Sequence, residues 1–240
     1  MLSAPSEEYQ VHIENSLLQW DKISNRFLPS LSRLFETDED SVNRSVRRMI
    51  FAHDIGKLSK RWQEAITAIA NGKKQHTPPH APLGAAYLLV WSKMFGVDGN
   101  LGNASVFAVL IHHIDSGVSG NSLESPDAQA ILEGLVKGGT EIIWHEEGDE
   151  ALRSLAFGDS ILPLETVTLQ SLTDLSDVLR SWSKCPRLLD QHRHRMLSSS
   201  LHHILKICDW RAATEREVDD KEKEVRRSVL EVLLNGGILP

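Results

Sequence analysis

The spacing of apolar residues is the feature that most constrains the fold of this chain. Between residues 11 and 35 they recur at three- and four-residue steps, which is the period of one face of an α-helix. The same period returns in several later segments, at residues 42–50, 58–69, 82–95, 104–114, 169–182 and 195–211. The pattern therefore predicts an all-α fold.

Proline, glycine and acidic residues indicate where the first helices break, begin and end. Pro29 is expected to interrupt the first helix, because proline has no amide hydrogen to donate. The second helix is expected to follow the acidic segment TDEDS at residues 37–41 and to stop at Gly56. It would then carry His53 and Asp54 in its last turn.

The remaining segments have weaker patterns. Residues 123–136 are expected to form one helix and residues 141–144 a short extended piece, while the charged residues 215–234 have the period of an amphipathic helix. We find no internal repeat, low-complexity tract or linker in the sequence. A single domain over residues 1–240 is therefore predicted.

Composition limits the partners and the compartment. The 26 Lys and Arg residues against 33 Asp and Glu residues give a net charge of −7, so a polyanion would have to bind a local basic patch. Cys185 and Cys208 are too few for a disulfide framework, which favours a reducing cytoplasm. No apolar run approaches the roughly 20 residues that cross a bilayer, so we expect neither secretion nor a membrane span.

Histidine is unusually frequent, with 11 residues, and histidine is the most common protein ligand of metals. Imidazole and carboxylate ligands without thiolates suit divalent manganese, nickel, cobalt, iron, zinc or magnesium. Taken singly, each candidate is more often a hydrogen-bonded core residue than a ligand. Five candidate ligand elements nevertheless occur in order along the predicted helices: His12, His53-Asp54, His80, His112-His113 and Asp209.

Five sequence segments around these residues resemble the successive motifs of the CRISPR-associated HD nuclease family. The most specific block is His53-Asp54-Ile55-Gly56-Lys57, followed by Arg61-Trp62-Gln63. The resemblance implies an HD-domain helical bundle with a central dinuclear metal site. Because the sequence ends at Pro240 without a Walker motif, it resembles the stand-alone subunit of type I interference. The segments are HIENSLLQW, AHDIGKLSKRWQ, HAPLGAAYLL, IHHID and ICDWRAA.

The resemblance also implies the roles of the site residues. One metal would be held by His12, His53, Asp54 and Asp209, and a second by His80, His112 and His113, with Asp54 as a bridge. Two ions roughly 3.5–4 Å apart can stabilise both the attacking and the leaving oxygen of a phosphoryl displacement, and a divalent ion can lower the pKa of bound water towards about 7. A second doublet, His202-His203, leaves open which histidine pair is functional.

Besides His53 and Asp54, Lys57 is a candidate catalytic residue. It could neutralise charge that develops on the scissile phosphate, or it could only complement the dipole at a helix end. Trp62 is expected to belong to the core. Cations near the HD doublet could track the nucleic-acid backbone or could be an ordinary solvated surface: Arg47, Arg48, Lys60, Arg61, Lys73 and Lys74.

These observations lead to a first functional hypothesis and two rivals. The first is a metal-dependent DNA nuclease that cleaves single-stranded DNA, together with a helicase subunit and an RNA-guided CRISPR effector complex. The second is an HD phosphohydrolase that acts on nucleotides or cyclic nucleotides. The third is an interaction subunit that binds metal without turnover.

Overall fold

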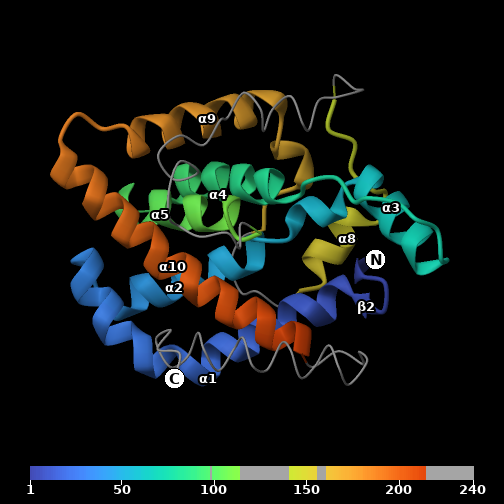
Figure 1. The fold of residues 1–240 in the computed structure, drawn as a ribbon, viewed down its shortest axis with the longest axis horizontal. Coiled ribbons are helices and arrows are strands. Elements are labelled where there is room, and N and C mark those ends of the chain that lie inside the picture. The colour runs from blue at the N-terminus through green and yellow to red at the C-terminus, as the bar shows by residue number, and fades with distance from the viewer. Residues whose placement is uncertain (98, 114–140, 156–160, 215–240) are drawn as a thin grey trace.

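The chain folds into a helical bundle in the computed structural model, as the apolar spacing predicts (Figure 1). The structure describes residues 1–97, 99–113, 141–155 and 161–214. The helices expected at residues 123–136 and 215–234 lie outside the described residues. The elements in chain order are β1 (Leu2–Ala4), β2 (Glu7–Glu8), α1 (Tyr9–Phe35), α2 (Glu39–Ala52), the 3₁₀ helix η1 (Ile55–Leu58), α3 (Lys60–Ala70), α4 (Ala81–Phe95), α5 (Gly99–Leu110), α8 (Gly148–Arg153), the 3₁₀ helix η2 (Leu164–Thr166), α9 (Leu169–Ser183) and α10 (Leu188–Thr214).

Helix α1 continues through Pro29, so the expected interruption was wrong. Proline cannot donate to the carbonyl of the residue four positions earlier, here Asn25. Both Pro29 and Asn25 are exposed, and solvent can therefore satisfy the carbonyl that the proline leaves free. The cost of the missing hydrogen bond is small enough for the apolar face of α1 to hold the helix together.

Helix α2 begins within the acidic segment and ends earlier than expected. The Asp38 side chain accepts a hydrogen bond from the Ser41 amide at 2.8 Å and caps the helix N-terminus. The helix ends at Ala52, so His53 and Asp54 follow its last turn, and Gly56 lies inside η1 instead of ending α2.

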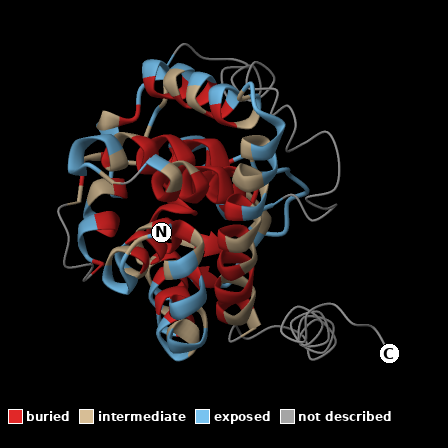
Figure 2. Ribbon diagram, turned by 90° about the vertical axis from the view of Figure 1, so that its left-hand side faces the viewer, coloured by how far each residue is buried: buried red, intermediate tan, exposed pale blue. Residues whose placement is uncertain are grey.

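The helices pack in layers around one hydrophobic core. Helix α10 packs against α1 and α5, and α4 lies between α5 and α9 (Figure 1). The outer helices have buried residues on the side that faces the interior and exposed residues on the opposite side, while α5 is buried along most of its length (Figure 2). Among the described residues, no helix combines the length and the apolar character of a membrane-spanning segment.

The N-terminus forms a small antiparallel hairpin, β1–β2, that the sequence patterns did not predict. Further along, Trp144 makes an isolated antiparallel bridge with Ser59, which agrees with the short extended piece expected at residues 141–144. Both features lie beside α3. Strand β1 contacts α3, and Trp144 pairs with Ser59, the residue directly before this helix.

Candidate metal centre

The ends of the core helices meet at one point and deliver the predicted ligands there. His53 and Asp54 follow α2, His80 directly precedes α4, and His112 and His113 follow α5. His12 lies in the first turns of α1 and Asp209 in the last turns of α10. Residues spread over nearly 200 positions are thereby brought into one cluster.

Two glycines permit this convergence. A Cβ atom on Gly56 would lie 2.1 Å from the His80 carbonyl oxygen, and a Cβ atom on Gly84 would lie 2.3 Å from the Ala52 carbonyl oxygen. In both cases the obstacle is backbone, which cannot rotate away. Gly56 is therefore required for η1 to pack against His80, and Gly84 for the start of α4 to pack against the end of α2.

Asp54 is at the centre of the cluster and is 1% exposed. Its Oδ2 atom lies 3.3 Å from His12 Nε2 and 3.4 Å from His53 Nε2. Its Oδ1 atom lies 3.0 Å from His80 Nε2 and 3.7 Å from His112 Nε2. Each carboxylate oxygen therefore faces a different pair of imidazoles.

Asp209 and His113 complete the two halves of the cluster. Asp209 Oδ1 lies 3.1 Å from His12 Nε2 and 3.8 Å from His53 Nε2, and His113 Nε2 lies 2.8 Å from His80 Nε2. The ligand atoms of His12, His53 and Asp209 all lie within 4.8 Å of one another, as do those of Asp54, His80, His112 and His113. Either group could hold a metal ion.

The hydrogen bonds of the buried histidines fit metal binding. His53 Nδ1 lies 2.6 Å from the Ile50 carbonyl oxygen and His112 Nδ1 lies 2.6 Å from the Val109 carbonyl oxygen, which places the proton on Nδ1. The buried Nε2 atoms of His12, His53 and His112 lie 3.1–3.8 Å from the carboxylate oxygens of Asp54 and Asp209. A cation between these nitrogens and oxygens could bind both kinds of atom, so the arrangement suits a metal ion.

Charge is distributed unevenly between the two halves. Burial lowers the pKa of His12, but the carboxylates of Asp209, Asp54 and Glu7 outweigh it and raise the pKa well above its usual value. Burial lowers the pKa of His80 to about 4, and burial with the neighbouring imidazoles lowers the pKa of His113 to about 2. At neutral pH the metal-free protein is therefore protonated at His12 and neutral at His80 and His113.

The two carboxyl groups of the cluster stay ionised. Burial raises the pKa of Asp54, but His53 and Lys57 outweigh it and hold the pKa well below its usual value. Burial also raises the pKa of Asp209, and hydrogen bonds to His12 and His53 reverse the shift. Ionised carboxylates beside imidazole nitrogens form a ligand set for hard or borderline divalent ions.

Lys57 lies in the last turn of η1 and also contacts the cluster. Its Nζ atom lies 2.6 Å from Asp54 Oδ2, and the residue is buried. Trp62 is also buried, with its ring 5.9 Å from that of His80 and 5.5 Å from Lys57 Nζ. The core assignment of Trp62 is thus confirmed.

Comparison with known proteins identifies the family of this chain. Residues 10–218 match the family described as the HD domain of Cas3. The chain belongs to the Cas3 HD domain family. Two proteins named CRISPR-associated endonuclease Cas3-HD are similar to it. The one from Pyrococcus furiosus is 23% identical over 213 residues, covering 86% of this chain and 88% of the relative. The one from Methanocaldococcus jannaschii is 26% identical over 222 residues, covering 86% and 85%.

A solved structure has the same fold as this Cas3 HD domain. It is described as the CRISPR-associated Cas3 HD domain protein MJ0384 from Methanocaldococcus jannaschii, and it matches with a TM-score of 0.64 and 21% identity. The match covers 85% of this chain and 98% of that structure. The HD-domain helical fold expected from the sequence is therefore confirmed.

Of the two histidine doublets, only the first lies in the metal-binding groups of the described residues. His202 is buried and His203 is partly buried, and burial lowers the pKa of His203, but neither lies in those groups. Both are on α10, one to two turns before Asp209. Of the two doublets, His112-His113 is therefore the one whose position would allow it to bind a metal ion.

The predicted basic patch divides into two parts. Arg47 on α2 forms an ion pair with Asp21 on α1. The guanidinium of Arg48, also on α2, lies 3.6 Å from the centre of the Trp91 ring on α4. The other four cations are exposed and lie in the first turn of α3 or in the loop after it: Lys60, Arg61, Lys73 and Lys74.

Sequence reasoning missed one buried charge beside the cluster. Glu7 on β2 is 6% exposed, and its Oε1 atom lies 3.2 Å from His12 Nδ1. The turn-forming pair Pro5-Ser6 between two short segments was a weak signal for the hairpin that carries Glu7. Nothing in the spacing of Glu7 and His12 indicates the contact.

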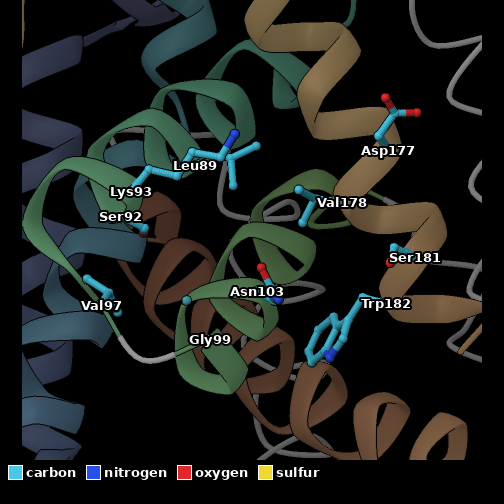
Figure 3. Close-up of a pocket in the computed structure, with 11 residues that line it drawn as sticks. Leu89, Ser92, Lys93, Val97, Gly99, Asn103, Asp177, Val178, Ser181 and Trp182 are labelled. Atoms are coloured by element: carbon cyan, nitrogen blue, oxygen red, sulfur yellow. The ribbon is translucent and has the colours of Figure 1, made fainter.

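A pocket of about 620 Å³ lies at the other ends of α4 and α5, away from the cluster (Figure 3). Apolar side chains from α4 and α9, including Leu89, Val178 and Trp182, line it together with the polar side chains of Asn103 and Ser181. His80 and His112 lie at the opposite ends of the same two helices. The pocket therefore takes no part in the metal centre.

Proposed function

We propose that this chain is a metal-dependent nuclease that hydrolyses phosphodiester bonds of DNA, preferentially single-stranded DNA, in CRISPR antiviral defence. Membership of the Cas3 HD domain family and the names of two relatives support the CRISPR role. The observation that carries the proposal is the Asp54 carboxylate, whose two oxygens face separate groups of histidines. Such a carboxylate suits a bridge between two ions.

The proposed ligands of one ion are His12, His53, Asp54 and Asp209, and those of the second are His80, His112 and His113. When bound, the ions would supply Lewis-acid stabilisation of the phosphoryl oxygens and a more acidic water. The chain itself fixes the imidazole rings through their Nδ1 hydrogen bonds to the Ile50 and Val109 carbonyls. Lys57, whose ammonium lies 2.6 Å from Asp54 Oδ2 at the proposed metal centre, is proposed to offset negative charge on the substrate.

Substrate is proposed to approach from the side of His113. His113 is partly open to solvent, although its ring packs against His80 and His112, whereas His12, His53 and His112 are 0% exposed. The exposed cations Lys60 and Arg61 begin α3 directly after the segment that holds Lys57. A positively charged path beside an open site suits a flexible single strand.

The proposed context is a single HD nuclease domain over residues 1–240 that acts with a separate helicase subunit and an RNA-guided effector complex. The described residues share one hydrophobic core, which supports a single domain. The proposed compartment is the cytoplasm, where thiols stay reduced, and Cys185 and Cys208 are both free.

The test is hydrolysis of labelled single-stranded DNA by the purified chain with manganese, nickel, cobalt or magnesium. His53→Ala and Asp54→Ala should abolish cleavage, while His192→Ala, which changes an exposed histidine of α10, should leave it intact. An excess of mononucleotides or cyclic nucleotides should not slow the cleavage of the labelled DNA.

Other outcomes would point to the rival functions. Turnover of nucleotides without DNA cleavage would replace the proposal with a nucleotide phosphohydrolase. Metal binding without turnover of either substrate, also when the helicase subunit is added, would replace it with a non-catalytic subunit.

A further inference from the structure

The N-terminal hairpin lies against the metal centre although the family match begins only at residue 10. Strand β1 contacts α3, and both strands contact α1. The hairpin carries Glu7, whose carboxylate is buried beside His12. Residues outside the matched region therefore touch a proposed ligand.

His12 differs from the other buried histidines in how its ring is held. His53 and His112 lie against carbonyls three residues earlier in their own segments, Ile50 and Val109. His12 instead has the Glu7 carboxylate at its Nδ1 atom, 3.2 Å away. A carboxylate partner fixes the tautomer of a ligating imidazole and makes it a stronger donor.

Glu7 is itself held in place. The Ser3 hydroxyl donates a hydrogen bond to Glu7 Oε2 at 2.7 Å. The Leu2 amide donates to Gln63 Oε1 at 3.1 Å, and Gln63 Nε2 donates to the Leu2 carbonyl at 2.8 Å. The same Gln63 Nε2 donates to the Lys57 carbonyl at 2.8 Å. The hairpin is thus fastened to the segment that carries Lys57.

We propose that Glu7 is a positioning residue of the metal centre, which orients His12 through Nδ1 so that His12 Nε2 faces the ion shared with His53 and Asp209. Ser3 and Gln63 hold Glu7 and the hairpin in register with the site. The hairpin is therefore a functional part of the domain. This inference rests on the proposed metal centre and assigns to it a residue that lies before the region matched by the family model.

The test compares metal binding by Glu7→Ala and Glu7→Gln with the wild type and with Glu8→Ala. Glu8 is the matched control, because it is the neighbouring glutamate of β2 and is exposed. Manganese affinity is measured by calorimetry, the ligand field by the visible absorption of bound cobalt, and folding by circular dichroism without metal.

Glu7→Ala should weaken binding of one of the two ions by roughly 10–100-fold and leave the other unchanged, as expected for loss of a ligand's hydrogen-bond partner. Glu7→Gln should lose less affinity, because its amide oxygen still accepts the Nδ1 proton, but should shift the cobalt spectrum. Glu8→Ala should match the wild type in manganese affinity and in the cobalt spectrum.

Equal affinity of Glu7→Ala and Glu8→Ala for both ions would overturn the inference. If Glu7→Ala does not fold, an unchanged cobalt spectrum in Glu7→Gln would overturn it as well. A wild type that binds no metal would instead refute the proposed metal centre, and the inference with it, so the two failures are distinguishable.

Discussion

Asp54 presents one carboxylate oxygen to each half of the cluster, and Lys57 lies within 2.6 Å of the oxygen that faces His12 and His53. A buried ammonium there would be costly without a charge to offset. Asp54 supplies one negative charge to the Lys57 ammonium, and the phosphate of an approaching substrate would supply a second. The proposed catalytic role of Lys57 is to offset the charge of that phosphate.

Lys57→Ala is expected to lower the single-turnover rate of DNA cleavage by roughly 10²–10³-fold, the usual effect of removing one charge-stabilising donor. Metal affinity should change far less, because Lys57 is not a ligand. Quenched-flow cleavage assays and metal titrations measure the two effects, with the exposed Lys184→Ala as control. Equal losses in metal affinity and rate would contradict the catalytic role.

Metal binding is expected to release protons from one half of the centre only. The raised pKa of His12 means that it carries a proton at pH 7 in the metal-free protein and must lose it to become a ligand. His80, with a pKa of about 4, has no proton to lose. Affinity should therefore rise with pH, and calorimetry in buffers of different ionisation enthalpy should detect the released proton. His12→Gln should abolish this buffer dependence; its persistence would be evidence against the assignment.

At the scale of elements, helix ends position the site. Helices α2 and α4 approach so closely that Gly84 has no room for a side chain, since its Cβ atom would lie 2.3 Å from the Ala52 carbonyl oxygen and 2.9 Å from that of His53. Any displacement of this contact moves the His53-Asp54 pair relative to His80.

Gly84→Ala is expected to destabilise the fold by about 1–3 kcal/mol, the usual cost of overpacking, and to weaken metal binding. Gly99→Ala is the matched control, because a Cβ atom there would meet nothing within 4 Å, and it should be neutral or stabilising. Urea unfolding with and without manganese measures both effects. Two glycine variants of equal stability would refute the packing argument.

Much at this scale could be predicted from the sequence, because helical periods and the His-Asp motifs are local signals. The grouping of the candidate ligands and the helix that starts at Ala81 are examples. The continuation of α1 through Pro29 could not be predicted, since it depends on the exposure of Asn25. The contact of Glu7 with His12 could not be predicted either, because it depends on a hairpin that Gln63 holds from another helix.

At the scale of the whole molecule, a net charge of −7 must be reconciled with a proposed polyanionic substrate. Arg47 pairs with Asp21 on α1, and Arg48 lies against Trp91 on α4. Lys60, Arg61, Lys73 and Lys74 are exposed, and we propose them as phosphate contacts. Binding should then depend strongly on salt.

The double variant Lys73→Ala and Lys74→Ala is expected to reduce the salt dependence of single-stranded DNA binding. Each phosphate contact contributes a slope of about 0.7 in log affinity against log salt for single strands, so the slope should fall by roughly 1.4. Fluorescence anisotropy at several salt concentrations measures it, with Lys184→Ala as control. An unchanged slope would place the DNA on another surface.

The most direct test of the central claim is anomalous diffraction from crystals grown with manganese. Two anomalous peaks, roughly 3.5–4 Å apart on either side of the Asp54 carboxylate, are predicted. One should lie beside His12, His53 and Asp209, and the other beside His80, His112 and His113. A single peak, or peaks that Asp54 does not bridge, would contradict the two-ion centre.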